Sequence, residues 1–276
     1  MFKSVIKLTA LLLLLLFSFV YTNKVFEEAR NTNPVMKEIK KYKRKNDIKA
    51  VEPILNGNEL IVGLSGIVVD KNESYNNMND NFDKNKIVVK KVLPKKSITK
   101  NNSYYIIKGN GSKKEVAIIF KIKNNDNYEK FINYDRNNKN NFTLFIDGKY
   151  LEDNPDKIYD YKNKYEIYNL GYNEKYDNNI SDTNRLIKSI TLKKSNYCLN
   201  ETKNKEYKKV CDRKNMISIT PKIINPSISD LKKKIENGSI ISYDLDNINI
   251  SNLNIIINII ESKGYKIVSL SKLIKE

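Results

Sequence analysis

Histidine is absent from all 276 residues of the sequence. Its absence excludes Ser-His-Asp and Cys-His catalysis, a histidine general acid, and every metal site that depends on imidazole ligands. Cysteine is also scarce, with two residues in the whole chain, which excludes metal sites built on several thiolates.

Acidic residues are too few to balance the basic ones, and the net charge is +18. This excess favours affinity for anionic polymers, such as wall polymers or anionic lipid surfaces. Compositional drift with a gain in solubility is the alternative explanation. No basic helix or basic segment interleaved with aromatics is present, so we expect no nucleic-acid partner. No glycine-rich phosphate loop is present either, since Gly109-Asn110-Gly111 has the composition of a turn.

The N-terminus has the pattern of an export sequence. Lys3 and Lys7 precede a largely apolar run, Leu8–Tyr21. Phe19-Val20-Tyr21 offers no small-residue cleavage site, so we interpret residues 1–22 as an uncleaved transmembrane signal anchor, with a cleaved signal peptide as the alternative. The body of the chain is then expected outside the cytoplasm, attached to the membrane through this helix or, alternatively, secreted.

Two further segments precede the main domain. Residues 23–50 carry apolar side chains at helical spacing and are interrupted at Pro34, which predicts a stalk helix or, alternatively, a solvated linker. Residues 51–112 contain short apolar runs and an Asn56-Gly57 turn signal, which predict a small β-rich domain.

Residues 113–276 have the pattern of an α/β domain. The apolar runs Val116–Ile122 and Phe142–Ile146 are separated by a polar segment of helical length. Such a strand, crossover and strand predict a βαβ unit with parallel strands. Near the end of the chain, apolar residues at helical spacing from Leu253 to Ile260 predict a helix, and Tyr265–Leu270 predicts a final strand.

Several segments resemble motifs of the polysaccharide deacetylase family, the carbohydrate esterases with NodB homology. Phe142–Gly148, reading Phe-Thr-Leu-Phe-Ile-Asp-Gly, is similar to the family's Ala-Thr-Phe-Phe-x-x-Gly. Lys263–Leu270 is similar to Lys-Gly-Tyr-x-Phe-Val-x-Leu. Residues 62–75 resemble, more weakly, a module of membrane-anchored deacetylase-like proteins from low-G+C Gram-positive bacteria. The resemblance implies a distorted, incomplete (β/α) barrel of the glycoside hydrolase/deacetylase type.

The reactive positions of that family are replaced. Lys121 and Ile122 stand where the family has its two aspartates, the base and the metal ligand. Leu170 and Glu174 stand at the positions of two metal-binding histidines, and Tyr243 or Asp244 lies near the position of a third histidine. Leu170 has no donor atom, and a lysine repels a metal cation. The resemblance therefore implies a pseudoenzyme with no catalytic residue, no metal and no cofactor.

What remains at these positions suits binding better than catalysis. Lysine favours an anion, and tyrosine rings stack on sugar faces while their hydroxyls form hydrogen bonds. We therefore predict weak binding of an anionic glycan or wall polymer, or of a protein partner, at the barrel mouth. The candidate residues are Lys121, Tyr172, Glu174, Tyr197 and Tyr243. An active deacetylase or hydrolase with a rebuilt site and a purely structural envelope protein are the alternatives.

The two cysteines, Cys198 and Cys211, bracket a lysine-rich loop. A disulfide is permitted in an exported domain. The alternative is a reactive thiol, but it would lack a histidine to activate it. We therefore favour a disulfide between them.

Overall fold

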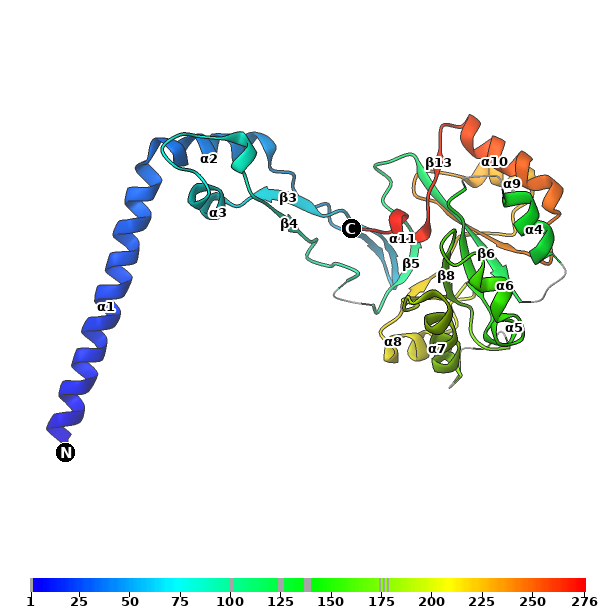
Figure 1. The fold of residues 1–276 in the computed structure, drawn as a ribbon, viewed down its shortest axis with the longest axis horizontal. Coiled ribbons are helices and arrows are strands. Elements are labelled where there is room, and N and C mark those ends of the chain that lie inside the picture. The colour runs from blue at the N-terminus through cyan, green and yellow to red at the C-terminus, as the bar shows by residue number, and fades with distance from the viewer. Residues whose placement is uncertain are drawn as a thin grey trace. The chain divides into compact units, whose positions relative to one another are not determined.

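The computed structural model describes residues 2–99, 102–123, 127–136, 140–173, 175, 177 and 179–276, with side chains except for residues 2–8 and 10 (Figure 1). The chain forms two compact units. The first contains residues 1–50 and 65–92, and the second contains residues 51–64 and 93–276. The segment predicted as one β-rich domain, 51–112, is thus divided between the two units.

The first unit contains helices α1 (Phe2–Thr32), α2 (Pro34–Asn46) and α3 (Lys71–Asn76), the 3-10 turn η1 (Lys84–Lys86), and an antiparallel pair of strands, β3 (Gly66–Val69) and β4 (Val89–Val92). The helix is interrupted between α1 and α2 because Asn33 caps α2 and Pro34 follows as the first residue of α2. The Asn33 side chain accepts a hydrogen bond from the Val35 amide at 2.8 Å. The predicted interruption of the stalk at Pro34 is therefore present.

The predicted transmembrane helix is not supported: within the described part of the chain, no helix is both long enough and apolar enough to cross a bilayer.

The second unit is built on one curled sheet with the strand order β1-β2-β5-β10-β9-β8-β7-β6-β12-β11, and β13 pairs with β6. All neighbours are parallel except β1 and β2, which form a hairpin through Gly57 at φ +56°. The α/β barrel prediction is confirmed in this coarser form. The strand bounds are β1 Ile54–Asn56, β2 Glu59–Ile61, β5 Tyr105–Lys108, β6 Glu115–Ile122, β7 Thr143–Ile146, β8 Glu166–Asn169, β9 Tyr197–Leu199, β10 Ile217–Ile219, β11 Ile223–Ile224, β12 Ile240–Asp244 and β13 Lys266–Ile267.

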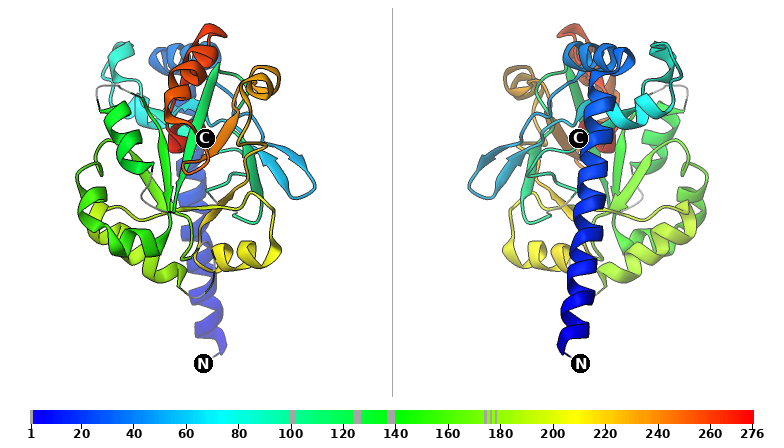
Figure 2. Two further views of the ribbon diagram at one scale, coloured as in Figure 1. Left: turned by 90° about the vertical axis from the view of Figure 1, so that its right-hand side faces the viewer. Right: turned by 90° about the vertical axis from the view of Figure 1, so that its left-hand side faces the viewer.

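Helices of the second unit lie along the outside of the curved sheet (Figure 2), except α11, whose Leu270 and Leu273 pack with inward-facing strand residues such as Ile119. Their bounds are α4 Tyr128–Asp135, α5 Gly148–Asp153, α6 Pro155–Tyr159, α7 Ile180–Thr191, α8 Lys205–Arg213, α9 Ile228–Lys234, α10 Leu253–Ser262 and α11 Leu270–Leu273, with the 3-10 turn η2 at Ile250–Asn252.

Alternation along the strands divides the core into an outer and an inner layer. In β6, Phe120 and Ile122 pack in the outer cluster with the helices, whereas Ile119 packs in the inner cluster. Successive side chains of a strand point to opposite faces, so Lys121 points inward, at the C-terminal end of β6.

The barrel is incomplete because β11 and the β1–β2 hairpin stand at the two ends of the sheet. An isolated antiparallel bridge joins Lys108 to Ser239 across this gap. Beside it, the Gly109 amide donates to the Gly238 carbonyl at 2.9 Å. The gap is therefore spanned by a few backbone contacts rather than by a continuous ladder.

Glu59 on β2 makes the second unit's stability depend on pH. Its carboxylate accepts hydrogen bonds from Lys203 and Lys222, and these contacts lower the pKa of Glu59. A lowered pKa gives stabilisation that is present above the unfolded-state pKa and lost as the pH falls through the folded-state value.

We expect Glu59→Gln to lower the free energy of unfolding by about 1 kcal/mol at pH 7, and by much less at an acidic pH below the folded-state pKa of Glu59, where the wild-type side chain is neutral as well. Urea unfolding of both proteins at the two pH values measures this difference. A loss of equal size at both pH values would contradict the assignment to charge.

Candidate functional site

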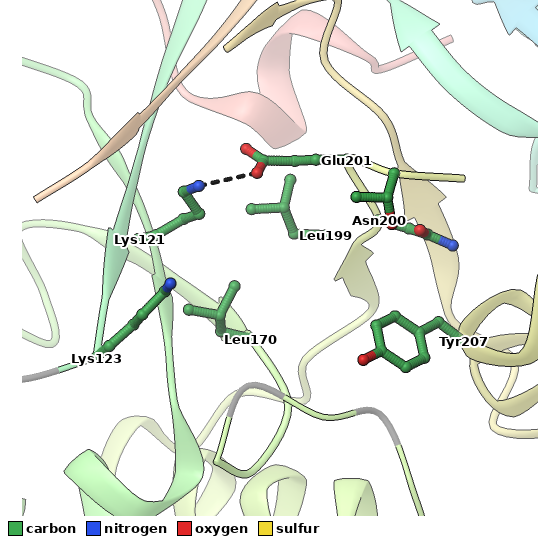
Figure 3. A pocket seen from close by; sticks show the side chains of 8 residues that line it. Lys121, Lys123, Leu170, Leu199, Asn200, Glu201 and Tyr207 are labelled. Atoms are coloured by element: carbon green, nitrogen blue, oxygen red, sulfur yellow. Dashed lines mark hydrogen bonds and ion pairs between the residues drawn. The ribbon is translucent and has the colours of Figure 1, made fainter. Parts of the chain in front are cut away.

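A cavity of about 180 Å³ lies at the C-terminal ends of the strands, the end of a parallel barrel where ligand sites are usually found. Figure 3 shows its side chains coming from four places: Lys121 and Lys123 at the end of β6, Leu170 after β8, Leu199 and Glu201 at the end of β9, and Tyr207 on α8. We call this cavity the mouth. Apolar side chains and charged groups both line it.

Lys121 is the central charge of the mouth. Its Nζ atom lies 2.8 Å from a carboxylate oxygen of Glu201 and 3.9 Å from one of Asp244. The side chains of these three residues are only 9%, 17% and 10% exposed. Asp244 also lies 3.2 Å from Lys123 Nζ. Two ammonium groups and two carboxylates thus face one another, and their charges balance within the cavity.

Glu201 is brought to Lys121 by a tightly bonded loop after β9. The Asn200 side chain donates to the Asn204 carbonyl and accepts from the Asn204 amide, both at 2.8 Å. Asn204 in turn caps α8, which carries Tyr207. The Ser242 hydroxyl donates to the second Glu201 oxygen at 2.5 Å. Each oxygen of the Glu201 carboxylate therefore has a partner.

A disulfide joins the two elements that flank this loop. Cys198 in β9 and Cys211 in α8 form a disulfide with a Cα–Cα distance of 6.3 Å. Both residues are fully buried and pack against Met216. This is the pair that the sequence favours for a disulfide, and it attaches α8 to the strand from which the Glu201 loop begins.

Tyr243 does not reach the mouth. It stacks on Phe120 in the outer layer, beneath the helices, with ring centroids 6.1 Å apart. The reason is the alternation of β12, which turns Ser242 and Asp244 inward and Tyr243 outward. Burial raises the pKa of Tyr243. The sequence prediction placed this segment at the site but selected Tyr243 as the site residue. In the parallel register of β12 and β6, Asp244 is the residue that pairs with Lys121.

Tyr197 lies in the inner layer but not in the lining of the mouth. It stands two residues before Leu199 on the same face of β9, and its ring contacts that of Tyr168 edge-on at 4.6 Å. Burial, with a smaller contribution from Glu166, raises the pKa of Tyr197 to about 12. The side chain therefore fills the barrel interior.

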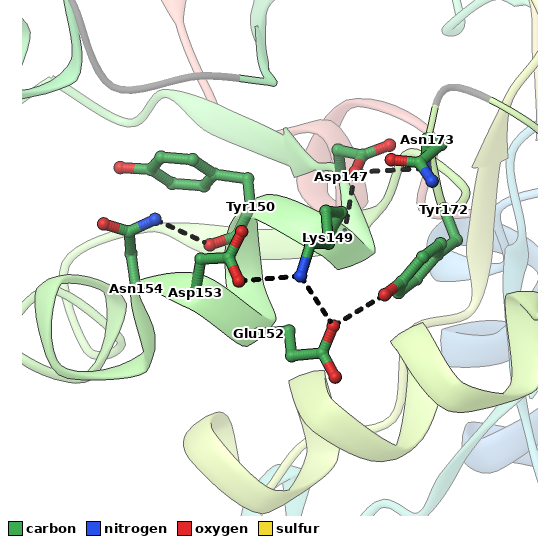
Figure 4. A network of polar contacts seen from close by, with 8 residues as sticks. All are labelled: Asp147, Lys149, Tyr150, Glu152, Asp153, Asn154, Tyr172 and Asn173. Carbon is green, nitrogen blue, oxygen red and sulfur yellow. Dashed lines mark hydrogen bonds and ion pairs between the residues drawn. The ribbon is translucent and has the colours of Figure 1, made fainter.

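Tyr172 is not among the residues that line the mouth, and its side chain points toward Glu152 of α5 (Figure 4). Its hydroxyl donates to Glu152 at 2.6 Å, and this bond raises the pKa of Tyr172. Lys149 joins the same network by contacting Glu152 at 3.4 Å and Asp153 at 2.8 Å. Glu174, the remaining candidate, lies outside the described residues. Of the predicted site residues, Lys121 alone is seen to line the mouth.

The mouth does not fit the divalent metal that the resemblance implies for active relatives. The Lys121 ammonium already stands between the inward-facing carboxylates, and Leu170 offers no donor atom. Across the described ranges, no three side chains of histidine, cysteine, aspartate or glutamate are grouped so as to hold a metal ion. We therefore derive no step through a metal.

Solved structures provide the comparison that decides the fold. A wild-type pseudoenzyme of carbohydrate esterase family 4 (CE4) from Bacillus anthracis superposes with a TM-score of 0.63 at 21% identity, covering 88% of this chain and 95% of that chain. A mutant of that protein with restored enzymatic activity gives 0.65 at 20% identity, covering 88% and 98%. The family 4 carbohydrate esterase PdaA from Bacillus subtilis gives 0.53 at 16% identity, covering 64% and 86%.

The fold is that of the family 4 carbohydrate esterases. No protein-family model matches the chain, and no curated protein matches it by sequence. The predicted resemblance to polysaccharide deacetylases is thus confirmed by the carbohydrate esterase fold, and its structural neighbours include pseudoenzymes. At these identities the likeness concerns the fold alone.

Sequence reasoning missed Glu201, the strongest partner of Lys121. It lies in a polar loop 80 residues away along the chain, without a motif that marks it. The one available signal was physical: a lysine inside an apolar strand requires a buried counter-charge.

Proposed function

We propose that this chain is a catalytically inactive protein with the carbohydrate esterase fold, and that it binds a glycan of the cell envelope at the mouth. The observation that carries the proposal is the ion pairing of Lys121 with Glu201 and Asp244. These contacts place a fixed ammonium group where a hydrolytic site needs a Lewis acid and an activated water. The pseudoenzymes among the structural neighbours support the same conclusion.

Glycan binding rests on the remaining groups of the mouth. The Tyr207 ring and the apolar side chains of Leu170 and Leu199 offer surface for a sugar ring, and Thr202 and Lys123 offer polar contacts. The charge of Lys121 is balanced by Glu201 and Asp244. The ligand therefore needs no anionic group, and a neutral sugar suits the mouth equally well.

We also propose an extracytoplasmic location, and the disulfide supports it. Disulfides persist in oxidising compartments and are rare in the reducing cytosol. The Cys198–Cys211 bond and the lysine-then-apolar pattern of the first 21 residues both suit an exported protein of the cell envelope.

The full chain is expected to release no acetate from N-acetylglucosamine oligosaccharides, with or without added zinc or cobalt, and to retain no stoichiometric metal after dialysis. Acetate release is measured beside an active family 4 esterase, and metal by elemental analysis. Retained metal together with acetate release would contradict the proposal that the protein is catalytically inactive.

Binding of the same oligosaccharides tests the proposal that the mouth binds a glycan. We expect Tyr207→Ala to weaken it several-fold through loss of the stacking surface, by roughly 1 kcal/mol. Tyr159→Ala is the matched control, because Tyr159 is 55% exposed and lies outside the mouth. Equal affinity of both variants would place the ligand elsewhere.

A further inference from the structure

A second, larger cavity of about 410 Å³ lies near the N-terminal ends of β8 and β9, the end of these strands opposite to the mouth. Glu166 begins β8 and Asn196 directly precedes β9, and both line it. None of the ion pairs of the mouth involves a residue of this cavity. We call it the basal cavity.

Three lysines line the basal cavity: Lys162, Lys193 and Lys194. Within the described part of the chain, no carboxylate lies at ion-pair distance from any of the three, in contrast to Lys121 and Lys123 at the mouth. Lys162 Nζ lies 3.4 Å from the centroid of the Tyr159 ring, a cation–π contact that brings no opposite net charge. The basal cavity therefore carries cationic charge that the protein itself does not neutralise.

Glu166 is the one carboxylate in the lining, and its hydrogen bonds are made within the protein. It accepts from the Ser271 amide at 3.0 Å, from the Ser271 hydroxyl, and from the Tyr168 hydroxyl at 3.3 Å. It is thus held against α11 and β8 rather than against a lysine. The three lysines and this one carboxylate leave a local excess of two positive charges.

The loop that carries two of the lysines is held in place. The Thr191 hydroxyl accepts from the Lys193 amide at 3.1 Å and donates to the Ile187 carbonyl at 2.7 Å. Ser195 accepts from the Asn169 amide at 3.0 Å, which ties the other end of the loop to β8. Lys193 and Lys194 therefore extend from a bonded loop, which lowers the entropic cost of gathering their charges around one ligand.

We propose that the basal cavity binds a phosphate-bearing polyol or sugar. A phosphate monoester carries close to two negative charges at neutral pH, which matches the local excess of two positive charges in this lining, and lysine ammonium groups bind phosphate as point charges. Tyr168, Thr191 and Asn196 supply apolar ring surface and polar groups for the uncharged part of the ligand. The site lies apart from the mouth and does not rest on the function proposed there.

The test uses the full chain and two probes, glycerol 3-phosphate and poly(glycerol phosphate), titrated by calorimetry at 0.05 M and 0.5 M salt. We expect the double variant Lys193→Gln, Lys194→Gln to bind about tenfold more weakly at low salt. We expect much of this difference to vanish at high salt, where exposed charges are screened. Binding of both probes assigns the site to a single phosphate group, and binding of the polymer alone assigns it to a phosphodiester chain.

The matched control is Lys232→Gln, Lys233→Gln on α9, which removes the same charge from another exposed position. It is expected to keep wild-type affinity, as is Tyr207→Ala at the mouth. Thermal melts verify that every variant is folded. Equal weakening by both lysine pairs, weakening by Tyr207→Ala, or no binding of either probe by the wild-type chain would each overturn the proposal.

Discussion

Replacing Lys121 by methionine is expected to lower the free energy of unfolding by about 3 kcal/mol at pH 7. Methionine fills much of the space of the lysine stem but removes the charge. Glu201 and Asp244 would then face each other across the barrel interior, and Glu201 would lose its 2.8 Å ion pair. A buried carboxylate without a counter-charge is costly because the protein interior cannot replace its hydration.

A double-mutant cycle separates this charge effect from packing. Adding Glu201→Gln to Lys121→Met is expected to recover a large part of the loss, because the amide is neutral and still accepts from Ser242. Lys123→Met is the matched single control and is expected to cost less, since Lys123 is more exposed than Lys121. Denaturant unfolding measures all five proteins: the wild type, the single variants Lys121→Met and Glu201→Gln, their double variant, and the control Lys123→Met. A Lys121→Met protein as stable as the wild type would show that the ion pairs contribute nothing.

Replacing both cysteines by alanine is expected to lower the free energy of unfolding by about 3 kcal/mol, the chain-entropy value for a closed loop of this size. The two residues are separated by 13 positions, and both are fully buried, so loss of packing around Met216 adds to the cost. Guanidinium unfolding of the wild type and the double variant gives the difference.

Reduction of the wild-type chain provides the control for packing, because it opens the disulfide without removing a side chain. The reduced wild type should lie between the oxidised wild type and the double alanine variant in stability. If the oxidised and reduced wild-type chains unfold at the same denaturant concentration, the bond does not stabilise the second unit.

The scaffold of the second unit was predictable because its strands and turns have local signals. The apolar runs predicted as strands at 116–122 and 142–146 are β6 and β7, within one residue at their starts, and they pair in parallel as predicted. The Asn56-Gly57 signal is the turn of the β1–β2 hairpin, where glycine adopts φ +56° without a steric penalty. Patterns of this kind depend on neighbours a few residues away.

The site was less predictable because its geometry depends on the strand face and on distant loops. All five residues of β12 are buried, so polarity could not indicate whether Tyr243 or Asp244 faces inward. The disulfide was predicted, but Glu201 reaches Lys121 through a loop that is fixed by bonds between Asn200 and Asn204, and neither of these bonds is visible as a motif. The division of residues 51–112 between two units likewise depends on long-range pairing, such as that of β2 with β5.

The cation of the mouth, the Lys121 ammonium, is part of the polypeptide. This changes how the stability of the fold depends on the composition of the medium. A bound metal ion stabilises a protein by an amount that rises with the logarithm of its free concentration above the dissociation constant, and a chelator removes that contribution. The Lys121 ammonium cannot dissociate from Glu201 and Asp244 into solution. The charge balance of this barrel is thereby independent of metal supply, and the protein is expected to keep the same stability in metal-starved medium as in metal-rich medium.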